Sequence, residues 1–136
     1  RLTARILAAA EWAAHQPPLA ALQIGLVARD TGCAAVIRAA VKATETFAAI
    51  ACIDGRADLA GAEPLRMLRC PVRFIVSPGG PESAMLEKAF SLVTGPRHWL
   101  VLPDTGDARQ HEMLQARAVT TWLEQHLGSE QRAKVE

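Results

Sequence analysis

The sequence predicts an α/β protein in which a short parallel sheet of about four strands is flanked by helices, a three-layer sandwich. Four short apolar runs with β-branched members recur along the 136 residues, and apolar residues at helical spacing lie between them. Strands that alternate with helical segments of about 10 to 15 residues indicate right-handed βαβ units and a parallel sheet covered on both faces. We therefore expect four strands in sequential order.

The first predicted strand covers residues 22–28 and opens the stretch LQIGLVARDTG. Gly32 allows the following backbone to pack close to the strand, and residues 33–43 form an alanine-rich helical pattern. Upstream, apolar residues at helical spacing predict an amphipathic helix over residues 1–16 that packs on the sheet. Pro17 and Pro18 end that pattern.

The remaining segments repeat the same strand and helix alternation as far as Gly128. The predicted domain spans residues 1–127, as part of a larger fold, and residues 128–136 form a charged tail. The further predicted strands are 47–53, 72–77 and 98–102; helices are expected at 82–93 and 111–126, a helical turn at 64–68, and loops at 56–61 and 103–110.

Composition excludes several function classes. A net charge of +1, with 15 basic and 14 acidic residues scattered along the chain, gives no electrostatic footprint for nucleic acid or an acidic membrane surface. Cys33, Cys52 and Cys70 have no C-x-x-C spacing and lie in apolar sequence, which is typical of core residues in a reducing compartment. No apolar run is long enough for a membrane span, so we expect a cytoplasmic protein without a cofactor.

The turn after the first strand has the layout of a nucleophile elbow, with Asp30 where serine is usual. With this turn, IGLVARDTG, and with the later segments DGRADLAG, CPVRFIVSPGG and WLVLPDTGDARQHE, the chain resembles the C-terminal half of α/β-hydrolase-fold proteins of the dienelactone-hydrolase-like branch. The order of these four segments carries the resemblance more than the strand pattern does.

The resemblance implies a serine on the elbow, an acid after the third strand of this half and a histidine after the last strand. This sequence departs at all three places, with Asp30, Gly80 and Asp107 respectively. The family also draws one oxyanion-hole N–H from an earlier strand loop that this chain does not contain. The usual hydrolytic triad is therefore absent.

Two readings of Asp30 remain open. It could be the nucleophile of an ester, epoxide or haloalkane hydrolase, as in related enzymes with aspartate on the elbow. In this hypothesis His111 activates water, and Glu82 or Asp104 orients the His111 imidazole. The alternative, which we favour, is a remnant elbow whose aspartate caps the next helix. Arg29 and Arg56 are expected to form an ion pair with this carboxylate.

The candidate catalytic residues are thus Asp30, Asp107 and His111, and the candidate substrate-binding residues are Arg29, Thr31 and Arg56. Acidic side chains at the carboxyl ends of the strands could also be imagined as metal ligands, but their spacing matches no metal motif, and we expect turn formers and helix caps. His98 is expected on a face of the sheet. The residues considered as metal ligands are Asp54, Asp58, Asp104, Asp107, His111 and Glu112.

Three function classes follow: a degenerate binding or assembly module, which we favour, a hydrolase with rewired residues, and a C-terminal half completed by another polypeptide. The apolar strand between Leu22 and Ala28 has only one helix upstream to cover its outer edge. An uncovered edge leaves backbone groups unpaired, so we expect a second copy or another polypeptide along it. A small-molecule ligand is a further candidate partner.

Overall fold

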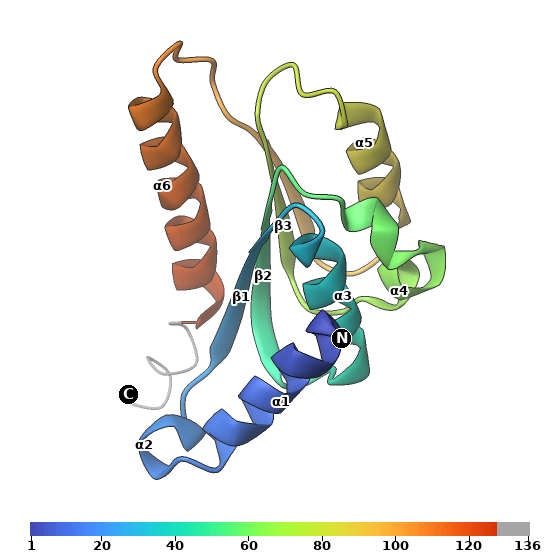
Figure 1. The fold of residues 1–136 in the computed structure, drawn as a ribbon, viewed down its shortest axis with the longest axis vertical. Coiled ribbons are helices and arrows are strands. Elements are labelled where there is room, and N and C mark those ends of the chain that lie inside the picture. Colours follow the sequence, from blue (N-terminus) through green and yellow to red (C-terminus); the bar gives the residue numbers. More distant parts are fainter. Residues whose placement is uncertain (128–136) are drawn as a thin grey trace.

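The computed structural model describes residues 1–127, which form one sheet with helices on both faces (Figure 1). All predicted strands are present within two residues of their expected ends. The elements in chain order are α1 (Leu2–Ala14), α2 (Pro17–Ala20), β1 (Ile24–Arg29), α3 (Gly32–Lys42), β2 (Phe47–Ile53), the 3₁₀ turn η1 (Ala57–Ala60), α4 (Ala62–Met67), β3 (Val72–Val76), α5 (Ser83–Leu92), β4 (Arg97–Val101) and α6 (Ala108–Leu127).

The sheet has the order β1-β2-β3-β4, and every neighbouring pair is parallel. The predicted topology and strand order are therefore confirmed. Because parallel strands require crossover connections, each strand is joined to the next by a helix. The carboxyl ends of all four strands consequently meet at one edge of the sheet, where the connecting loops cluster.

Two apolar clusters make the core, one on each face of the sheet. On one face, α3, α4 and α5 cover a cluster in which Phe74 is 1% exposed, stacks on Trp99 and meets the Phe90 ring edge-to-face. On the other face, α6 is the one helix over the sheet within residues 1–127, with Trp122 against β2 and β3 (Figure 1). Because both faces of β2 are buried, its sequence is a continuous apolar run.

All three cysteines are buried, as expected for core residues. A hydrogen bond with the Cys33 thiol, followed by burial, raises the pKa of the Cys52 thiol well above its ordinary value. Burial raises the pKa of Cys70 to about 12, and its thiol donates to the Phe47 carbonyl. The thiols of Cys52 and Cys70 therefore stay protonated at neutral pH and behave as small apolar side chains.

Some expectations about the connections were wrong. The first helix packs against α3 and not on the sheet, because its small apolar stripe, with only Ala10 buried, meets the alanine-rich outer side of α3. Residues 57–60 form a 3₁₀ turn where a loop was expected. Pro17 and Pro18 were expected only to end a helix, but they begin α2 directly after Gln16. Proline at the first helical position explains α2, since its missing N–H has no partner there anyway.

The last helix begins at Ala108, three residues before the expected start at His111. The tail at residues 128–136 lies outside the described residues. Along the part of the chain that the structure describes, no helix combines the length and apolar character that crossing a membrane requires.

Candidate functional site

The turn after β1 retains the strained geometry of an elbow. Asp30 has φ of 50°, a left-handed conformation that non-glycine residues rarely adopt. Its carbonyl accepts hydrogen bonds from the backbone N–H of Cys33, at 3.2 Å, and of Arg56, at 2.9 Å. These two bonds hold the turn between the start of α3 and the loop after β2, and they leave the Asp30 side chain exposed.

Gly55 permits this close approach. A Cβ at Gly55 would lie 1.9 Å from Cys33 Sγ and 3.0 Å from the Asp30 carbonyl oxygen. No side chain fits there, so the loop after β2 can brace the elbow only with glycine at this position. The fold therefore maintains the backbone geometry of the elbow, although Asp30 stands where serine is usual.

A second polar group joins the ends of β2 and β3. Asp54, directly after β2, also has a left-handed backbone, with φ of 43°. Its Oδ1 accepts the backbone N–H of Ser77 at 2.7 Å, and its Oδ2 lies 2.5 Å from Ser77 Oγ. Both carboxylate oxygens of Asp54 are therefore engaged by one residue of the neighbouring strand end.

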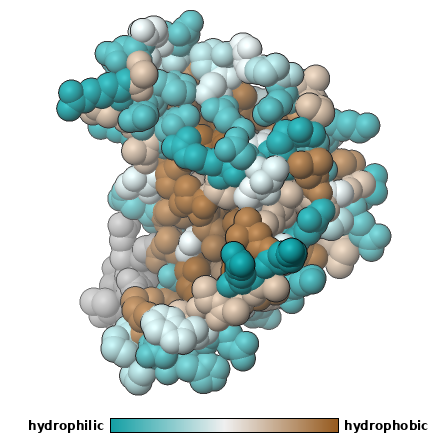
Figure 2. All heavy atoms as spheres, in the orientation of Figure 1, coloured by the Kyte–Doolittle hydropathy of each residue, from teal (hydrophilic) through white to brown (hydrophobic). Residues whose placement is uncertain are grey.

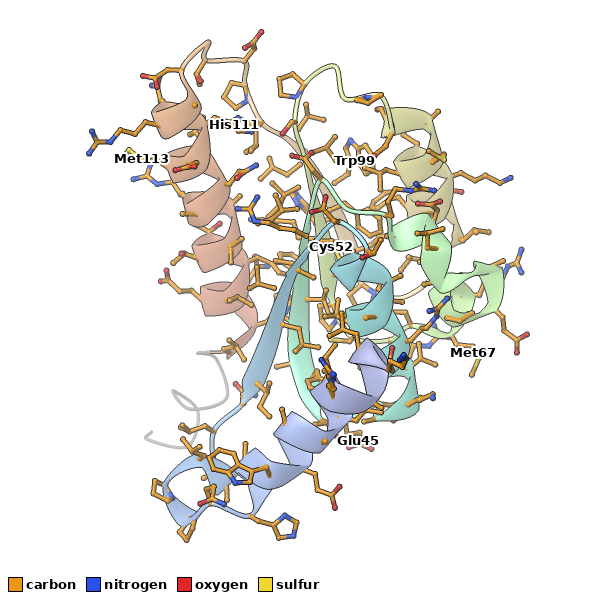
Figure 3. The ribbon with its side chains drawn as sticks, in the orientation of Figure 1. Glu45, Cys52, Met67, Trp99, His111 and Met113 are labelled. Carbon is orange, nitrogen blue, oxygen red and sulfur yellow. The ribbon has the colours of Figure 1, made fainter. Side chains whose placement is uncertain are left out.

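The same serine contacts His111, which lies on the first turns of α6 and faces the strand ends (Figure 3). His111 Nε2 lies 2.9 Å from Ser77 Oγ and 3.2 Å from Gln115 Nε2. Gln115 is 5% exposed, and its Oε1 accepts a hydrogen bond from Arg29 at 3.1 Å. A continuous network therefore runs from the end of β1 through α6 to the ends of β3 and β2.

This network engages Nε2 of His111 in hydrogen bonds. Because Arg29 donates to Gln115 Oε1, the Gln115 amide group directs its N–H bonds toward His111 Nε2. Ser77 has one hydroxyl proton and two neighbours that can accept it, so it bridges Asp54 and His111 without satisfying both as donor at once. His111 Nε2 is occupied by Ser77 and Gln115.

Ser77 itself lacks the surroundings of a nucleophile. Its backbone N–H is used by Asp54, and the next residue, Pro78, has no N–H to donate to a developing oxyanion. Two shallow hollows adjoin it, one of about 220 Å³ beside Asp54 and the Gly80–Ser83 turn, and a more open one of about 280 Å³ beside His111 and the Asp104–Ala108 loop. The contacts of Ser77 with Asp54 and His111 therefore fit a structural link between loops better than a catalytic nucleophile and its base.

The expected ion pairs to Asp30 were wrong. Arg56 forms a bidentate pair with Asp58, with N–O distances of 3.0 and 2.9 Å, which raises the pKa of Arg56 and lowers that of Asp58. The Arg29 guanidinium reaches Gln115, because β1 directs it to the α6 face. The Arg56 contact with its near neighbour in sequence requires less ordering of the chain than a contact across the elbow would.

The expected capping role of Asp30 was also wrong, since Thr31 occupies the N-cap of α3 and no side-chain cap bond is present there. Thr31 is exposed beside the elbow. Asp107, by contrast, caps α6: its Oδ1 accepts from the backbone N–H of Arg109 at 2.9 Å. A carboxylate at a helix N-terminus is a stabilising arrangement, so Asp107 has a structural task where the resemblance places a base.

Other residues considered from the sequence take structural positions. His98 lies on the α6 face as expected and stacks on Trp122, with its Nδ1 accepting from Arg73 Nε at 3.1 Å. Within residues 1–127, no three metal-ligating side chains come together in a group that could hold a metal ion. The sequence interpretation missed Ser77 and Gln115 as partners of His111. The signal for Ser77 was its place at a strand's carboxyl end, next to that of Asp54.

Comparison with a solved structure supports the fold of this chain. No protein-family model matches the chain. No curated protein matches it either. Among solved structures, the chain is similar to dienelactone hydrolase from Anabaena variabilis, with a TM-score of 0.86 and 26% sequence identity over 92% of this chain. The match covers 59% of that protein, so this chain spans somewhat over half of its length. Residues of this chain therefore form part of a dienelactone-hydrolase-like α/β-hydrolase fold.

Proposed function

We propose that this chain is a catalytically degenerate hydrolase-like module that serves in binding or assembly. The observation that supports this best is the engagement of His111 Nε2 by Ser77 and Gln115, beside an elbow that carries Asp30 in place of serine. A general base must be within reach of the proton that it removes. The imidazole of His111 instead contacts Ser77 after β3 and Gln115 of α6, and the Asp107 carboxylate caps a helix.

Ester turnover tests this proposal. Purified protein is assayed with p-nitrophenyl acetate beside the variants Asp30→Asn and Asp30→Ser, with Glu87→Gln on α5 as the control for loss of an exposed carboxylate. We expect all four proteins to remain at the buffer background, because Asp30→Ser restores a nucleophile without a base. Turnover above background that falls in Asp30→Asn and persists in Glu87→Gln would overturn the proposal.

A second candidate function is supported by the left-handed, exposed Asp30. In this alternative, the Asp30 carboxylate attacks a carbon of the substrate: a haloalkane loses its halide, an epoxide ring opens and its oxygen takes a proton, and an ester loses its alcohol. The product on Asp30 is an alkyl ester in the first two cases and an anhydride in the third, and water that a base activates hydrolyses it. Intact-mass measurement after incubation with 1-bromobutane and with styrene oxide tests it. An adduct that Asp30→Asn abolishes would favour this candidate, whereas an unmodified mass favours the degenerate module.

A third candidate is a hydrolase half that another polypeptide completes. It is supported by the span of the match, which leaves about two fifths of the dienelactone hydrolase uncovered, and by the open outer edge of β1. Such a partner would add strands beside β1. Activity that appears only in the presence of a second polypeptide, and that depends on Asp30 or His111, would distinguish this candidate from the first.

A further inference from the structure

The hydrogen-bonded network around His111 has a donor at one end and an acceptor at the other. The Arg29 guanidinium can only donate, and its Nη2 donates to Gln115 Oε1 at 3.1 Å. The ionised Asp54 carboxylate can only accept, and its oxygens take the backbone N–H and the hydroxyl proton of Ser77. These two ends fix the direction of the hydrogen bonds next to them.

The two directions meet at one atom, His111 Nε2. On the Arg29 side, the Gln115 amide turns its N–H groups toward Nε2 at 3.2 Å, which requires a lone pair on that nitrogen. On the Asp54 side, Ser77 Oγ has directed its proton to the carboxylate and lies 2.9 Å from Nε2, which requires a proton on that nitrogen. A ring nitrogen carries either a lone pair or a proton. His111 can therefore complete only one of the two hydrogen bonds at a time.

Burial favours the bond with Gln115 while the imidazole is neutral. Gln115 is 5% exposed, and a buried N–H that loses its acceptor is costly because water cannot replace it. Ser77 is only partly buried and lines the open hollow of about 280 Å³, where water can donate to its hydroxyl oxygen. Figure 2 shows mostly hydrophilic residues over the loops at this end of the molecule, in the upper part of the view. The neutral ring with its proton on Nδ1 therefore satisfies the network best.

Protonation of the imidazole reverses this preference. An imidazolium carries a proton on both ring nitrogens, so Nε2 can no longer accept from Gln115 and donates to Ser77 Oγ instead. This bond is charge-assisted, and the Ser77 hydroxyl continues it to the Asp54 carboxylate. Any rotation of the Gln115 amide that relieves the contact between the two donors also moves Oε1 away from Arg29.

The charged groups near the His111 imidazole come from the ends of β1 and β2 and from the loop before α6. Those that reach it through the network or line the same hollow are Arg29, Asp54, Asp104 and Asp107. The neighbouring charged side chains on α6 itself are exposed, and residues 77–81 after β3 carry no charge. Three of the four groups are carboxylates, so an imidazolium at this position lies among charges of opposite sign.

We propose that His111 is a proton-operated switch, in which the neutral imidazole binds Gln115 and the protonated imidazole binds Ser77. The first state orients the Gln115 amide toward Arg29 at the end of β1, and the second links α6 to Asp54 after β2. Acidification therefore ties the first turns of α6 to the ends of β2 and β3 and releases Arg29 beside the elbow. The switch needs no reaction at the elbow, so it goes beyond the proposed binding or assembly role and does not rest on it.

Double-mutant cycles measured by urea denaturation at pH 8.0 and pH 5.5 test the proposal. One cycle combines His111→Ala with Gln115→Ala and the other combines His111→Ala with Ser77→Ala, and each coupling is the factor by which the unfolding equilibrium constant departs from additivity. The other histidines are present in every member of a cycle, so their titration cancels. From pH 8.0 to pH 5.5, we expect the Gln115 coupling to fall by roughly fivefold and the Ser77 coupling to rise by at least as much.

The control is a third cycle that combines His111→Ala with Ser91→Ala, a serine on α5 whose hydroxyl donates within its own helix. It should show no coupling at either pH. Couplings of Gln115 and Ser77 that do not change in opposite directions between the two pH values would overturn the proposal.

Nuclear magnetic resonance of the unaltered chain keeps the test decisive if a variant does not fold. The scalar coupling between His111 Nε2 and the Gln115 amide nitrogen, which a hydrogen bond transmits, should be present at pH 8.0 and lost at pH 5.5. The ring nitrogen shifts of His111 should show a proton on Nδ1 alone at pH 8.0 and on both nitrogens at pH 5.5. A proton on Nε2 at pH 8.0, or a Gln115 coupling that persists at pH 5.5, contradicts the switch.

Discussion

The two edges of the sheet differ in how they are protected from other chains. At β4, the Arg97 guanidinium lies 4.3 Å from the centre of the Phe90 ring and donates to the Phe90 carbonyl. His98 is held on the sheet by Arg73 and Trp122. At β1, no charged side chain precedes Arg29, and Arg29 is directed to Gln115. Charged edges discourage strand addition, so we expect β1 to be less protected against strand addition than β4.

The largest expected effect comes from removing the aromatic support of β4. Phe74 is fully buried and packs against Phe90 and Trp99, so Phe74→Ala deletes the centre of this cluster. We expect the free energy of unfolding to fall by about 3 to 5 kcal/mol, measured by urea denaturation. Leu26→Ala in β1 is the comparison, because Leu26 is only partly buried, and its loss should be smaller. An equal or larger loss at Leu26 would contradict the view that β4 is the well-anchored edge.

A smaller effect is expected when the cation at β4 is removed. Arg97→Ala loses the contact with the Phe90 ring and exposes a less charged edge, so the free energy of unfolding should fall by about 1 kcal/mol. Arg97→Lys is the control that keeps the charge. Light scattering should also show that Arg97→Ala associates more strongly with rising concentration than the original chain does, and that Arg97→Lys does not. If both variants associate alike, charge is not what protects β4.

The smallest expected effect is a pH dependence that originates at β4. Burial and then the Arg73 charge lower the pKa of His98 below its ordinary value, and the pKa of His126 is lowered for the same reasons. The unfolded chain therefore binds more protons, and stability is lost as pH falls through the ordinary histidine pKa of about 6.5. Urea midpoints at pH 7.5 and 5.5 should differ less in His98→Gln than in His15→Gln. An unchanged difference in His98→Gln would contradict this origin.

Much of the fold could be predicted from the sequence because each strand is a short apolar run bounded by turn residues. β2 was predicted residue for residue from FAAIACI, since both faces of that strand are buried. The packing of α1 on α3 could not be predicted, because a weak alanine stripe fits a helix as well as a sheet.

The candidate site was less predictable for a different reason. His111 was identified as the histidine near the last loop, but its partners Ser77 and Gln115 depend on where α6 is seated across the sheet. Arg56 was assigned to Asp30 when a nearer carboxylate, Asp58, was available two residues away. Local spacing predicts contacts within a turn, whereas contacts between elements require the tertiary arrangement.

Amide hydrogen exchange at the two edges tests the account most directly. Exchange is followed by mass spectrometry in peptides that cover residues 22–29 and 97–102, at two protein concentrations that differ by about a hundredfold. If β1 accepts strand addition more readily than β4, protection of residues 22–29 increases with concentration while that of residues 97–102 stays constant. Protection that is independent of concentration in both peptides, or that increases only at residues 97–102, would contradict the account.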